Sequence, residues 1–349
     1  MELKVLDLFS GAGGFSKGIE MAGHTITKHY FSEIDKHAIA NYLYNFKNAK
    51  YYGSVTDVRG RRNEVDIITF GSPCQDFSLA GKRAGMEGQR SSLILEAIRL
   101  IDEIRPSIFV WENVKGTFSS NNGADFWAII SSFANIGGYR LEWQLLNTSW
   151  FLPQNRERIY LVGHLAERSE PRVFPIGEKN ENTKKEYEEA SVGDSSNQGV
   201  IGYSRDSKGK ILNYHKKNIA NTLHSSSGIG GNTDQYVYNN KALNKTIKEN
   251  NLKQGEVKAL DLYNHKAKDI SPTLQEPHHN SLRLYDGYSI RKLTEIECER
   301  LQGFPDDWSK YGVYDGEVKQ IPRTQRYKLM GNAVTTEVVA EIFRRIKLK

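Results

Sequence analysis

Short apolar runs alternate with amphipathic stretches through residues 1–165. The runs have the length of buried strands, and the amphipathic stretches repeat their apolar positions every three or four residues, as helices do. Strands are expected at 4–9, 25–31, 50–52, 65–70, 108–111, 139–146 and 159–163, and helices at 15–22, 36–46, 91–104 and 126–136. This order predicts an α/β fold built on a doubly wound, mostly parallel sheet.

The pattern changes at about residue 166. From there to about residue 288 the periodicity fades, Asn, Ser, Gly and Lys become frequent, and 183–197 contains almost no large apolar side chain. Order returns near Ile290, because Thr294 and Glu297 have the spacing of a capping box at a helix start. The sequence therefore predicts an ordered domain (1–165), a smaller irregular region with a linker (166–288) and a return segment (289–349) with a helix at 335–346.

Composition and charge narrow the class of protein. The net charge is +6, and residues 201–349 carry the positive excess, as binding to a polyanion would require. No apolar run approaches the roughly 20 residues of a membrane span, and the first residues run into a strand without a signal peptide. Cys74 and Cys298 are the only cysteines, too few for a disulfide framework or a four-cysteine zinc site. We expect a reducing, cytoplasmic setting.

The segment 70–78, FGSPCQDFS, is the strongest candidate for chemistry. Gly71 and Pro73 end an apolar strand abruptly, which leaves Cys74 on a loop at the carboxyl end of that strand. Parallel-sheet enzymes keep their reactive groups at this edge, and a thiolate is the strongest nucleophile that a side chain offers. The alternative is a small apolar core residue, but a cysteine between turn formers suits a core poorly.

A glycine-rich turn follows the first strand. Residues 10–14 read SGAGG and lead into a helix, so a ligand could approach the backbone and an anion could approach the helix N-terminus. Glu33 follows the second strand, which is the position of the acid that binds ribose hydroxyls in dinucleotide folds. A purely steric turn and a solvated loop acid are the alternatives.

Further polar groups fall at predicted strand ends. Glu112 reaches the same sheet edge as Cys74, either as a general acid or as part of a structural ion pair. Gln154, Arg156 and Arg158 alternate directly before the strand expected at 159–163. In an extended backbone all three should project to one side toward a shared target.

Taken together, these segments resemble the cytosine-5 DNA methyltransferase family of prokaryotes and phages, of the restriction-modification type. The resemblance covers 4–165 and 289–346. It implies the fold of the S-adenosylmethionine-dependent methyltransferases, with 166–288 as a DNA target-recognition domain and 289–349 completing the recognition hinge and the catalytic domain. It rests on six blocks in one order: Phe9 to Gly14, Pro73-Cys74-Gln75, Glu112-Asn113-Val114, Gln154-x-Arg156-x-Arg158, Arg291 to Pro305, and Gly331-Asn332-Ala333-Val334.

The resemblance implies a cofactor, S-adenosyl-L-methionine, with S-adenosyl-L-homocysteine as product and no metal. Its site would be formed by Phe9, Ser10, Gly11, Gly13, Gly14, Glu33, Ile34, Ser54, Val55, Pro73, Asn332 and Ala333. One position departs from the family pattern, which has Gly-Asp after the third strand, where the acid binds the adenine amine. This chain has Gly53-Ser54, so either Ser54 or the nearby Asp57 would make that contact.

The resemblance also implies the reaction, which is methylation of carbon 5 of a flipped-out cytosine in a specific double-stranded DNA sequence through a covalent cysteine adduct. Cys74 would add to carbon 6, Glu112 would hold ring nitrogen 3 and the exocyclic amine, and Arg158 would bind the ring oxygen. Arg156 and Gln154 would belong to the same catalytic group. DNA contacts are expected from Ser78, Arg90, Thr222, Leu223, Thr273, Leu274 and Arg283, two pairs of which fall in the repeated pattern Ile-x-x-Thr-Leu at 219–223 and 270–274.

Three other functions would share some of these features. A tRNA cytosine-5 methyltransferase would share the motifs but have a shorter recognition region, and a non-enzymatic reader would be expected to lack Cys74, Glu112 or Arg158. A dinucleotide-dependent oxidoreductase would explain the first two strands alone. We expect a monomer that acts on double-stranded DNA in the cytoplasm of a prokaryotic cell, away from membranes, with any cognate restriction endonuclease acting separately.

Overall fold

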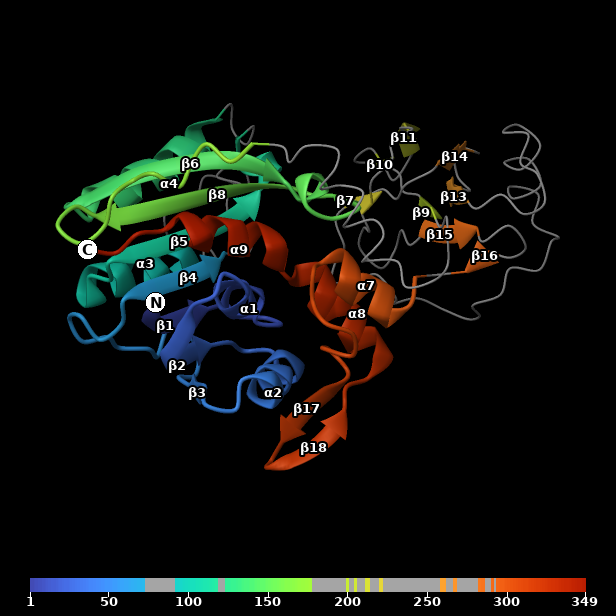
Figure 1. The fold of residues 1–349 in the computed structure, drawn as a ribbon, viewed down its shortest axis with the longest axis horizontal. Coiled ribbons are helices and arrows are strands. Elements are labelled where there is room, and N and C mark those ends of the chain that lie inside the picture. The colour runs from blue at the N-terminus through green and yellow to red at the C-terminus, as the bar shows by residue number, and fades with distance from the viewer. Residues whose placement is uncertain are drawn as a thin grey trace.

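A seven-stranded sheet forms the centre of the molecule (Figure 1). The computed structural model describes residues 1–72, 92–118, 123–177 and 293–349, together with the backbone of eight short strands between 199 and 291. The strand order is β3-β2-β1-β4-β5-β8-β6. These strands are β1 (Glu2–Leu8), β2 (Thr25–Ser32), β3 (Lys50–Tyr51), β4 (Ile67–Gly71), β5 (Ile108–Val114), β6 (Tyr139–Asn147) and β8 (Glu157–Leu165).

The sheet is mostly parallel. Strands β3, β2, β1, β4 and β5 run in one direction, and β8 lies antiparallel between β5 and β6. The chain moves outward from β1 to β3 and then returns to place β4 on the other side of β1, so the winding direction reverses between β1 and β4. Ligands of doubly wound sheets bind at such a reversal. The predicted doubly wound fold is confirmed.

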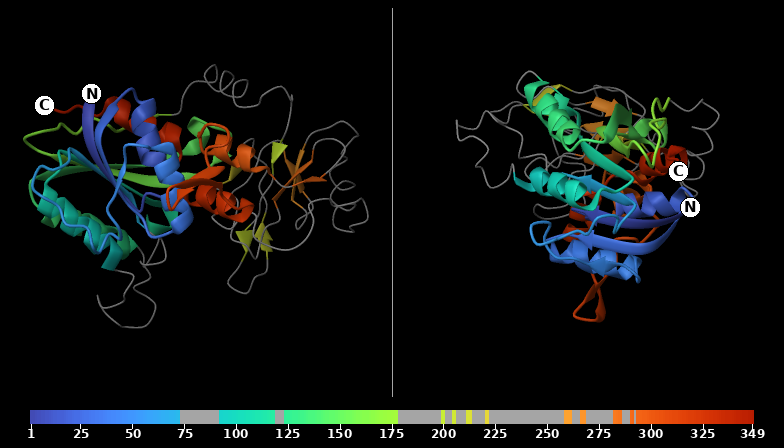
Figure 2. Two further views of the ribbon diagram at one scale, coloured as in Figure 1. Left: turned by 90° about the horizontal axis from the view of Figure 1, so that it is seen from below. Right: turned by 90° about the vertical axis from the view of Figure 1, so that its left-hand side faces the viewer.

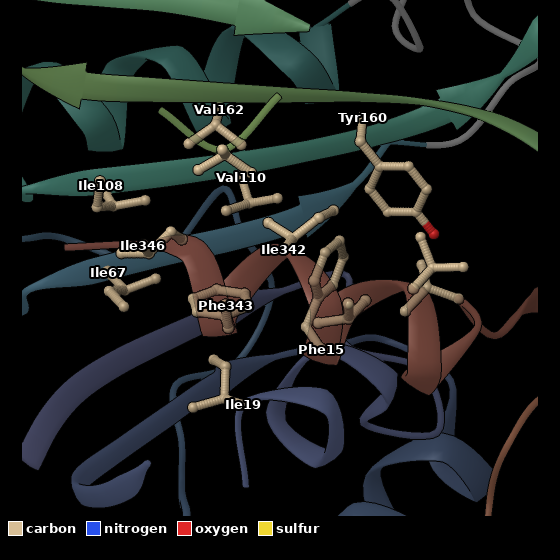
Figure 3. Packing of buried hydrophobic residues seen from close by; sticks show 14 of the residues in the cluster. Phe15, Ile19, Ile67, Ile108, Val110, Tyr160, Val162, Ile342, Phe343 and Ile346 are labelled. Atoms are coloured by element: carbon tan, nitrogen blue, oxygen red, sulfur yellow. The ribbon is translucent and has the colours of Figure 1, made fainter. Parts of the chain in front are cut away.

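Helices cover both faces of the sheet (Figure 2). Helices α1 (Gly14–Met21) and α9 (Thr336–Arg345) pack on one face, where Phe15, Ile19, Ile342 and Phe343 meet apolar strand residues such as Val110 (Figure 3). Helices α3 (Ser92–Ile104) and α4 (Ala124–Asn135) pack on the other face. A third cluster joins α2 (Lys36–Asn45) to the return segment through Tyr42, Phe46 and Trp308. The two ends of the chain therefore share one core.

Helices α1 and α9 approach each other closely because α1 has two glycines on its contact surface. A Cβ atom added to Gly14 would lie 2.6 Å from Val334 Cγ2, and one added to Gly18 would lie 2.5 Å from Val339 Cβ. Both distances are shorter than a real carbon contact. The glycines therefore let the return segment lie directly against the turn that follows β1.

The return segment differs in part from the expectation. Thr294 caps α7 (Glu295–Leu301), and the predicted capping box with Glu297 is confirmed. Three further elements are not among the predicted ones, namely the hairpin of β17 (Tyr311–Tyr314) and β18 (Glu317–Gln320) and the helix α8 (Arg323–Asn332). Asn332 ends α8, and α9 begins at Thr336, one residue after the predicted start of a helix at 335.

The region between 178 and 292 is described only as short strands. Strands β13, β14, β15 and β16 form one sheet, in which β9 also pairs with β15, and β10 pairs with β11. Strand β12 pairs in parallel with β7 (Gln154–Asn155) of the first domain. The strands are β9 (Gly199–Val200), β10 (Ser204–Arg205), β11 (Ile211–Asn213), β12 (Ala220–Asn221), β13 (Lys258–Asp261), β14 (Lys266–Lys268), β15 (Leu282–Tyr285) and β16 (Ile290–Arg291). Among the described residues no helix has the length and apolar character needed to cross a bilayer.

We predict that Gly18→Ala destabilises the protein. Alanine in place of glycine normally stabilises a helix by about 1 kcal/mol, but here the methyl group would overlap Val339, and overpacking costs about 1–3 kcal/mol. Urea unfolding measures the difference. Gly116→Ala is the control, because a Cβ there would lie 3.9 Å from its nearest neighbour, and its unfolding free energy should change by less than about 0.5 kcal/mol. A Gly18→Ala protein as stable as the wild type would contradict this account of the helix contact.

Candidate active site

An acid and a guanidinium group meet at the carboxyl end of β5. Arg158 Nε lies 3.0 Å from Glu112 Oε1, and both side chains are largely buried. Oε1 accepts no hydrogen bond from the described residues. Glu112 also lies close to the neighbouring strand, because a Cβ on Gly71 would be 3.1 Å from Glu112 Oε2. The pair therefore occupies the edge at which β4 ends, and Glu112 itself lies within β5 instead of following it.

Cys74 lies outside the described residues, and so do Pro73, Ser78 and Arg90. The last described residues before Cys74 lie next to Glu112. Gly71 pairs with Glu112 across β4 and β5, and Cys74 is the third residue after Gly71. The chain therefore leaves β4 beside Glu112, three residues before Cys74.

Gln154 and Arg156 have different partners from Arg158. Gln154 is fully buried, and its Nε2 donates to the carbonyl oxygen of Leu301 in α7. Arg156 Nη2 donates to the carbonyl oxygen of Ala333 at 2.8 Å. Arg156 falls between β7 and β8, so the three side chains do not alternate along one continuous strand. The expectation that all three share one target is therefore wrong, since these two bind the return segment.

The glycine turn after β1 has an unusual backbone. Phe9, Gly11 and Gly13 all have positive φ angles, of 51°, 53° and 80°. The space around the glycines differs, because a Cβ on Gly13 would lie 2.4 Å from the Phe46 ring, whereas one on Gly11 would meet only the Phe9 carbonyl oxygen, at 4.0 Å. Gly13 and Gly14 are therefore required by packing. Gly11 is the glycine whose open side a ligand can approach.

Glu33 is held beside this turn by backbone donors. Its Oε2 accepts from the Gly11 N–H at 2.9 Å, and its Oε1 accepts from the N–H groups of Ile34 and Asp35 at 2.7 and 3.0 Å. An ionised carboxylate has about four acceptor sites, so one remains for a further donor such as a ribose hydroxyl. The geometry suits the predicted role of Glu33, and Ile34 beside it is 79% exposed.

The segment after β3 lies next to Glu33. The Glu33 N–H donates to the Gly53 carbonyl oxygen at 3.3 Å. Ser54 is therefore the residue directly after the one that binds the Glu33 backbone. Ser54 Oγ lies 2.9 Å from Thr56 Oγ1, which donates to Asp57 Oδ1 at 3.2 Å. Asp57 is exposed, whereas Val55 is buried among apolar residues of the α3 face. Both Ser54 and Asp57 therefore remain available to a ligand.

The remaining residues of the predicted cofactor site differ in their exposure to solvent. Asn332 is exposed, and Ala333 is buried with its carbonyl bound to Arg156. Ser10 is buried, and its Oγ has no hydrogen-bond partner among the described residues. No three His, Cys, Asp or Glu side chains of the described residues come together as metal ligands.

The predicted DNA-contacting residues are described least. Thr222, Leu223, Thr273 and Leu274 lie outside the described residues, as does the second copy of the repeated pattern. The backbone of Arg283 lies in β15, paired with Leu260 of β13.

A buried polar cluster that the sequence analysis missed lies beneath the glycine turn. We call Asp7, Ser16, His29, Tyr42 and Thr69 the Asp7 cluster. Asp7 accepts from Thr69 at 2.8 Å, from Tyr42 at 3.1 Å and from Ser16 at 3.2 Å. Ser16 and Tyr42 also contact His29 Nε2, at 2.9 and 2.7 Å. Because Asp7 precedes the turn and Ser16 follows it, their hydrogen bond joins the two ends of the turn. The one available signal was an acid inside the apolar run 4–9.

Burial sets the protonation of this cluster. Removal from water raises the pKa of Asp7 to about 7 and outweighs the three hydroxyl donors, which lower it. Removal from water also lowers the pKa of His29 to about 4, so the imidazole is neutral at pH 7. The turn therefore rests on a carboxyl group that is partly protonated near neutral pH.

The fold and the site define a class. A seven-stranded sheet of this order, with a glycine turn after the first strand and a backbone-held acid after the second, is the architecture of the S-adenosylmethionine-dependent methyltransferases. The solved structure of a prophage-encoded E. coli protein has this fold, with a TM-score of 0.59, 22% identity and coverage of 98% of this chain and 97% of that chain.

The model of C-5 cytosine-specific DNA methylases matches residues 3–348. The chain belongs to this family and is accordingly a DNA (cytosine-5-)-methyltransferase. It is similar to the orphan methyltransferase M.SPRI of Bacillus phage SPR, with 26% identity over 438 aligned residues that cover 99% of this chain and 97% of the relative. It is also similar to the type II methyltransferase M.Bsp6I of a Bacillus species, with 28% identity and coverage of 99% and 98%.

We predict that Asp7→Asn changes the pH dependence of stability. The pKa of Asp7 is raised in the folded state above its ordinary value of 3.8, so folding favours the protonated form of this carboxyl group. Wild-type stability should therefore fall, relative to the variant, as pH rises from about 4.5 to about 7.5, by up to roughly 4 kcal/mol for a shift of this size. Urea unfolding across this range measures the difference. Parallel pH profiles for the two proteins would rule out a protonated Asp7.

Proposed function

We propose that this methyltransferase moves a methyl group from S-adenosyl-L-methionine to carbon 5 of a flipped-out cytosine in a specific double-stranded DNA sequence, through a covalent adduct with Cys74. One observation carries the proposal: the Glu112–Arg158 pair lies at the sheet edge where Gly71 and Ser72 lead into Pro73-Cys74. This supports a site in which the acid and the guanidinium group act at the sheet edge from which the chain continues toward Cys74.

Each group has a defined task in this scheme. An aromatic cytosine must become an enamine before carbon 5 can accept a methyl group. The Cys74 thiolate adds to carbon 6 while Glu112 holds a proton at ring nitrogen 3, which gives carbon 5 its electron density. Arg158, already paired with Glu112, binds the ring oxygen. Once carbon 5 carries the methyl group, loss of its proton to a base breaks the bond between carbon 6 and Cys74 and restores the aromatic ring. The base must leave the duplex first, because a stacked ring exposes neither face.

The residues around the glycine turn fit the proposed cofactor. Gly11 has open space where a Cβ would lie, and Glu33 keeps acceptor capacity for a ribose hydroxyl. Ser10 Oγ is a buried polar atom that has no hydrogen-bond partner among the described residues. A ligand bound at this turn could supply the missing hydrogen bond. S-adenosylmethionine supplies the methyl cation when bound at this turn. We infer that product release returns S-adenosyl-L-homocysteine and that no metal takes part.

The region 166–288 is proposed as the target-recognition domain. Its positive charge suits DNA phosphates, and its β12 strand pairs with β7, next to the residues that bind the return segment. We propose that the protein acts as a monomer in the cytoplasm of a prokaryotic cell. A cognate restriction endonuclease, where there is one, would act as a separate protein.

The proposal is tested by incubating the protein with labelled S-adenosylmethionine and either random duplex DNA or tRNA. Label should enter DNA and not tRNA, and bisulfite sequencing of the product should give one recognition sequence. Transfer to tRNA alone would assign the protein to the other branch of the family, and transfer to neither would overturn the proposal.

We predict that Cys74→Ser abolishes methyl transfer and leaves the dissociation constants for DNA and S-adenosylhomocysteine within about threefold, because an alcohol is far less acidic than a thiol. The wild type should form a covalent adduct with duplexes that contain 5-fluorocytosine, from which carbon 5 cannot lose its substituent. Cys298→Ser is the matched control and should stay active, because Cys298 is buried in α7. Turnover by the serine variant, or no adduct with the wild type, would remove Cys74 from the mechanism.

We predict that Asp57→Ala weakens binding of S-adenosylhomocysteine by about 1 kcal/mol or less, as expected for one exposed hydrogen bond. Asp57 is bound by Thr56 and reaches Ser54 only through that residue, so its loss should disturb the adenine end of the site modestly. Titration calorimetry measures the dissociation constant. A rise of tenfold or more, with the fold intact by circular dichroism, would show that Asp57 takes the role of the acid that the family has one position after Gly53.

A further inference from the structure

Ser72 binds two buried donors just before the segment that carries Cys74. Its Oγ accepts from Trp111 Nε1 at 3.0 Å and from Asn113 Nδ2 at 3.1 Å. Trp111 and Asn113 are fully buried, and Ser72 is 5% exposed. We call these three residues the Ser72 cluster. Because a buried N–H without an acceptor is costly, the serine hydroxyl is required by both of its partners.

The register of the sheet places the Ser72 cluster around Glu112. Gly71 pairs with Glu112, so Ser72 lies beside Asn113. Side chains alternate along a strand, so Trp111 and Asn113 lie on one face of β5 and Glu112 lies on the other. The two donors are the residues directly before and after the acid, and the acceptor is two residues before Cys74.

Both donors are themselves fixed in place. Asn113 Oδ1 accepts from the Val114 N–H at 2.7 Å, which sets the orientation of its amide. Trp111 packs against Phe133 of α4, with the ring centroids 5.7 Å apart. Rotation of either side chain away from Ser72 would therefore break other contacts. The hydroxyl joins the end of β4 to a rigid part of β5.

We propose that Ser72, with Trp111 and Asn113, is a positioning residue for methyl transfer that fixes the start of the Cys74 segment relative to Glu112. The inference rests on the proposed function, because the distance between Cys74 and Glu112 matters only if both groups act on the same cytosine ring. The thiolate must approach carbon 6 to about 3–3.5 Å while the carboxyl group holds nitrogen 3, and small misplacements lower the rate strongly. The hydroxyl faces β5, so its loss should change the rate more than ligand affinity.

The test compares single-turnover methylation and ligand binding in two variants. Ser72→Ala removes the acceptor, and its rate constant should fall by about 10- to 100-fold. Trp111→Phe keeps an aromatic ring but removes one of the two donors, so its rate constant should fall less, by about 3- to 10-fold. Dissociation constants for S-adenosylhomocysteine and for recognition-sequence duplex should stay within about threefold of the wild type in both.

Two matched controls lie away from the cluster. Ser107→Ala replaces a serine of similar burial, 7% exposed, one residue before the opposite end of β5. Trp143→Phe makes the same aromatic change at a 37% exposed tryptophan on β6. Both should keep the wild-type rate constant. A loss in the controls as large as in the Ser72 and Trp111 variants would show a general effect of such substitutions and would overturn the inference.

Covalent trapping on 5-fluorocytosine duplexes separates the two proposals. A wild type that forms no adduct would overturn the proposed function and the positioning role with it. If the wild type is trapped and both variants are trapped equally fast, the function stands and the positioning role is wrong. A parallel loss of cofactor or DNA affinity would likewise assign the cluster to binding or folding. If Ser72→Ala does not fold, Trp111→Phe decides the outcome alone.

Discussion

The close contact between α1 and α9 is the constraint on which the rest of the structure depends. Gly14 and Gly18 remove the side chains that would keep these helices apart, so Val334 and Val339 can lie against α1. The same contact brings the return segment to the glycine turn, where Trp308 donates to the Ala12 carbonyl oxygen at 2.9 Å. Two segments separated by residues 178–292 thus form one core.

Buried polar contacts then define the site within that frame. The Asp7 cluster joins the ends of the glycine turn, and the Ser72 cluster joins the ends of β4 and β5 on the other side of the strand reversal. Gln302 forms a third such connection, because its Nε2 donates to the Met330 carbonyl and its Oε1 accepts from Thr335. The strand residues on either side of Glu112 are therefore joined by hydrogen bonds to Ser72, and their spacing follows from the sheet register.

Most of the frame could be predicted from the sequence, because strand length, helix periodicity and the capping box of Thr294 are local properties. The site was predicted in part. Glu112 and Arg158 meet, but the alternation of Gln154 and Arg156 could not reveal that their partners are Leu301 and Ala333, far along the chain. Alternation in the sequence predicts the direction of side chains within one continuous strand. It could not show that one strand ends before Arg156 and the next begins after it. Partners that come from distant segments need the tertiary fold.

The pairing of α1 with α9 has a consequence for synthesis of the protein on the ribosome. Met21 ends α1, and Thr336 begins α9, so the apolar side of α1 is made long before the helix that covers it. Until then Phe15 and Ile19, with the strand residues around them, face water or a chaperone. The nascent residues 1–165 can form their sheet early, but they acquire a complete core only after residues 166–335 have been translated. The core of the enzyme is therefore completed only after the last helix of the chain has been synthesised.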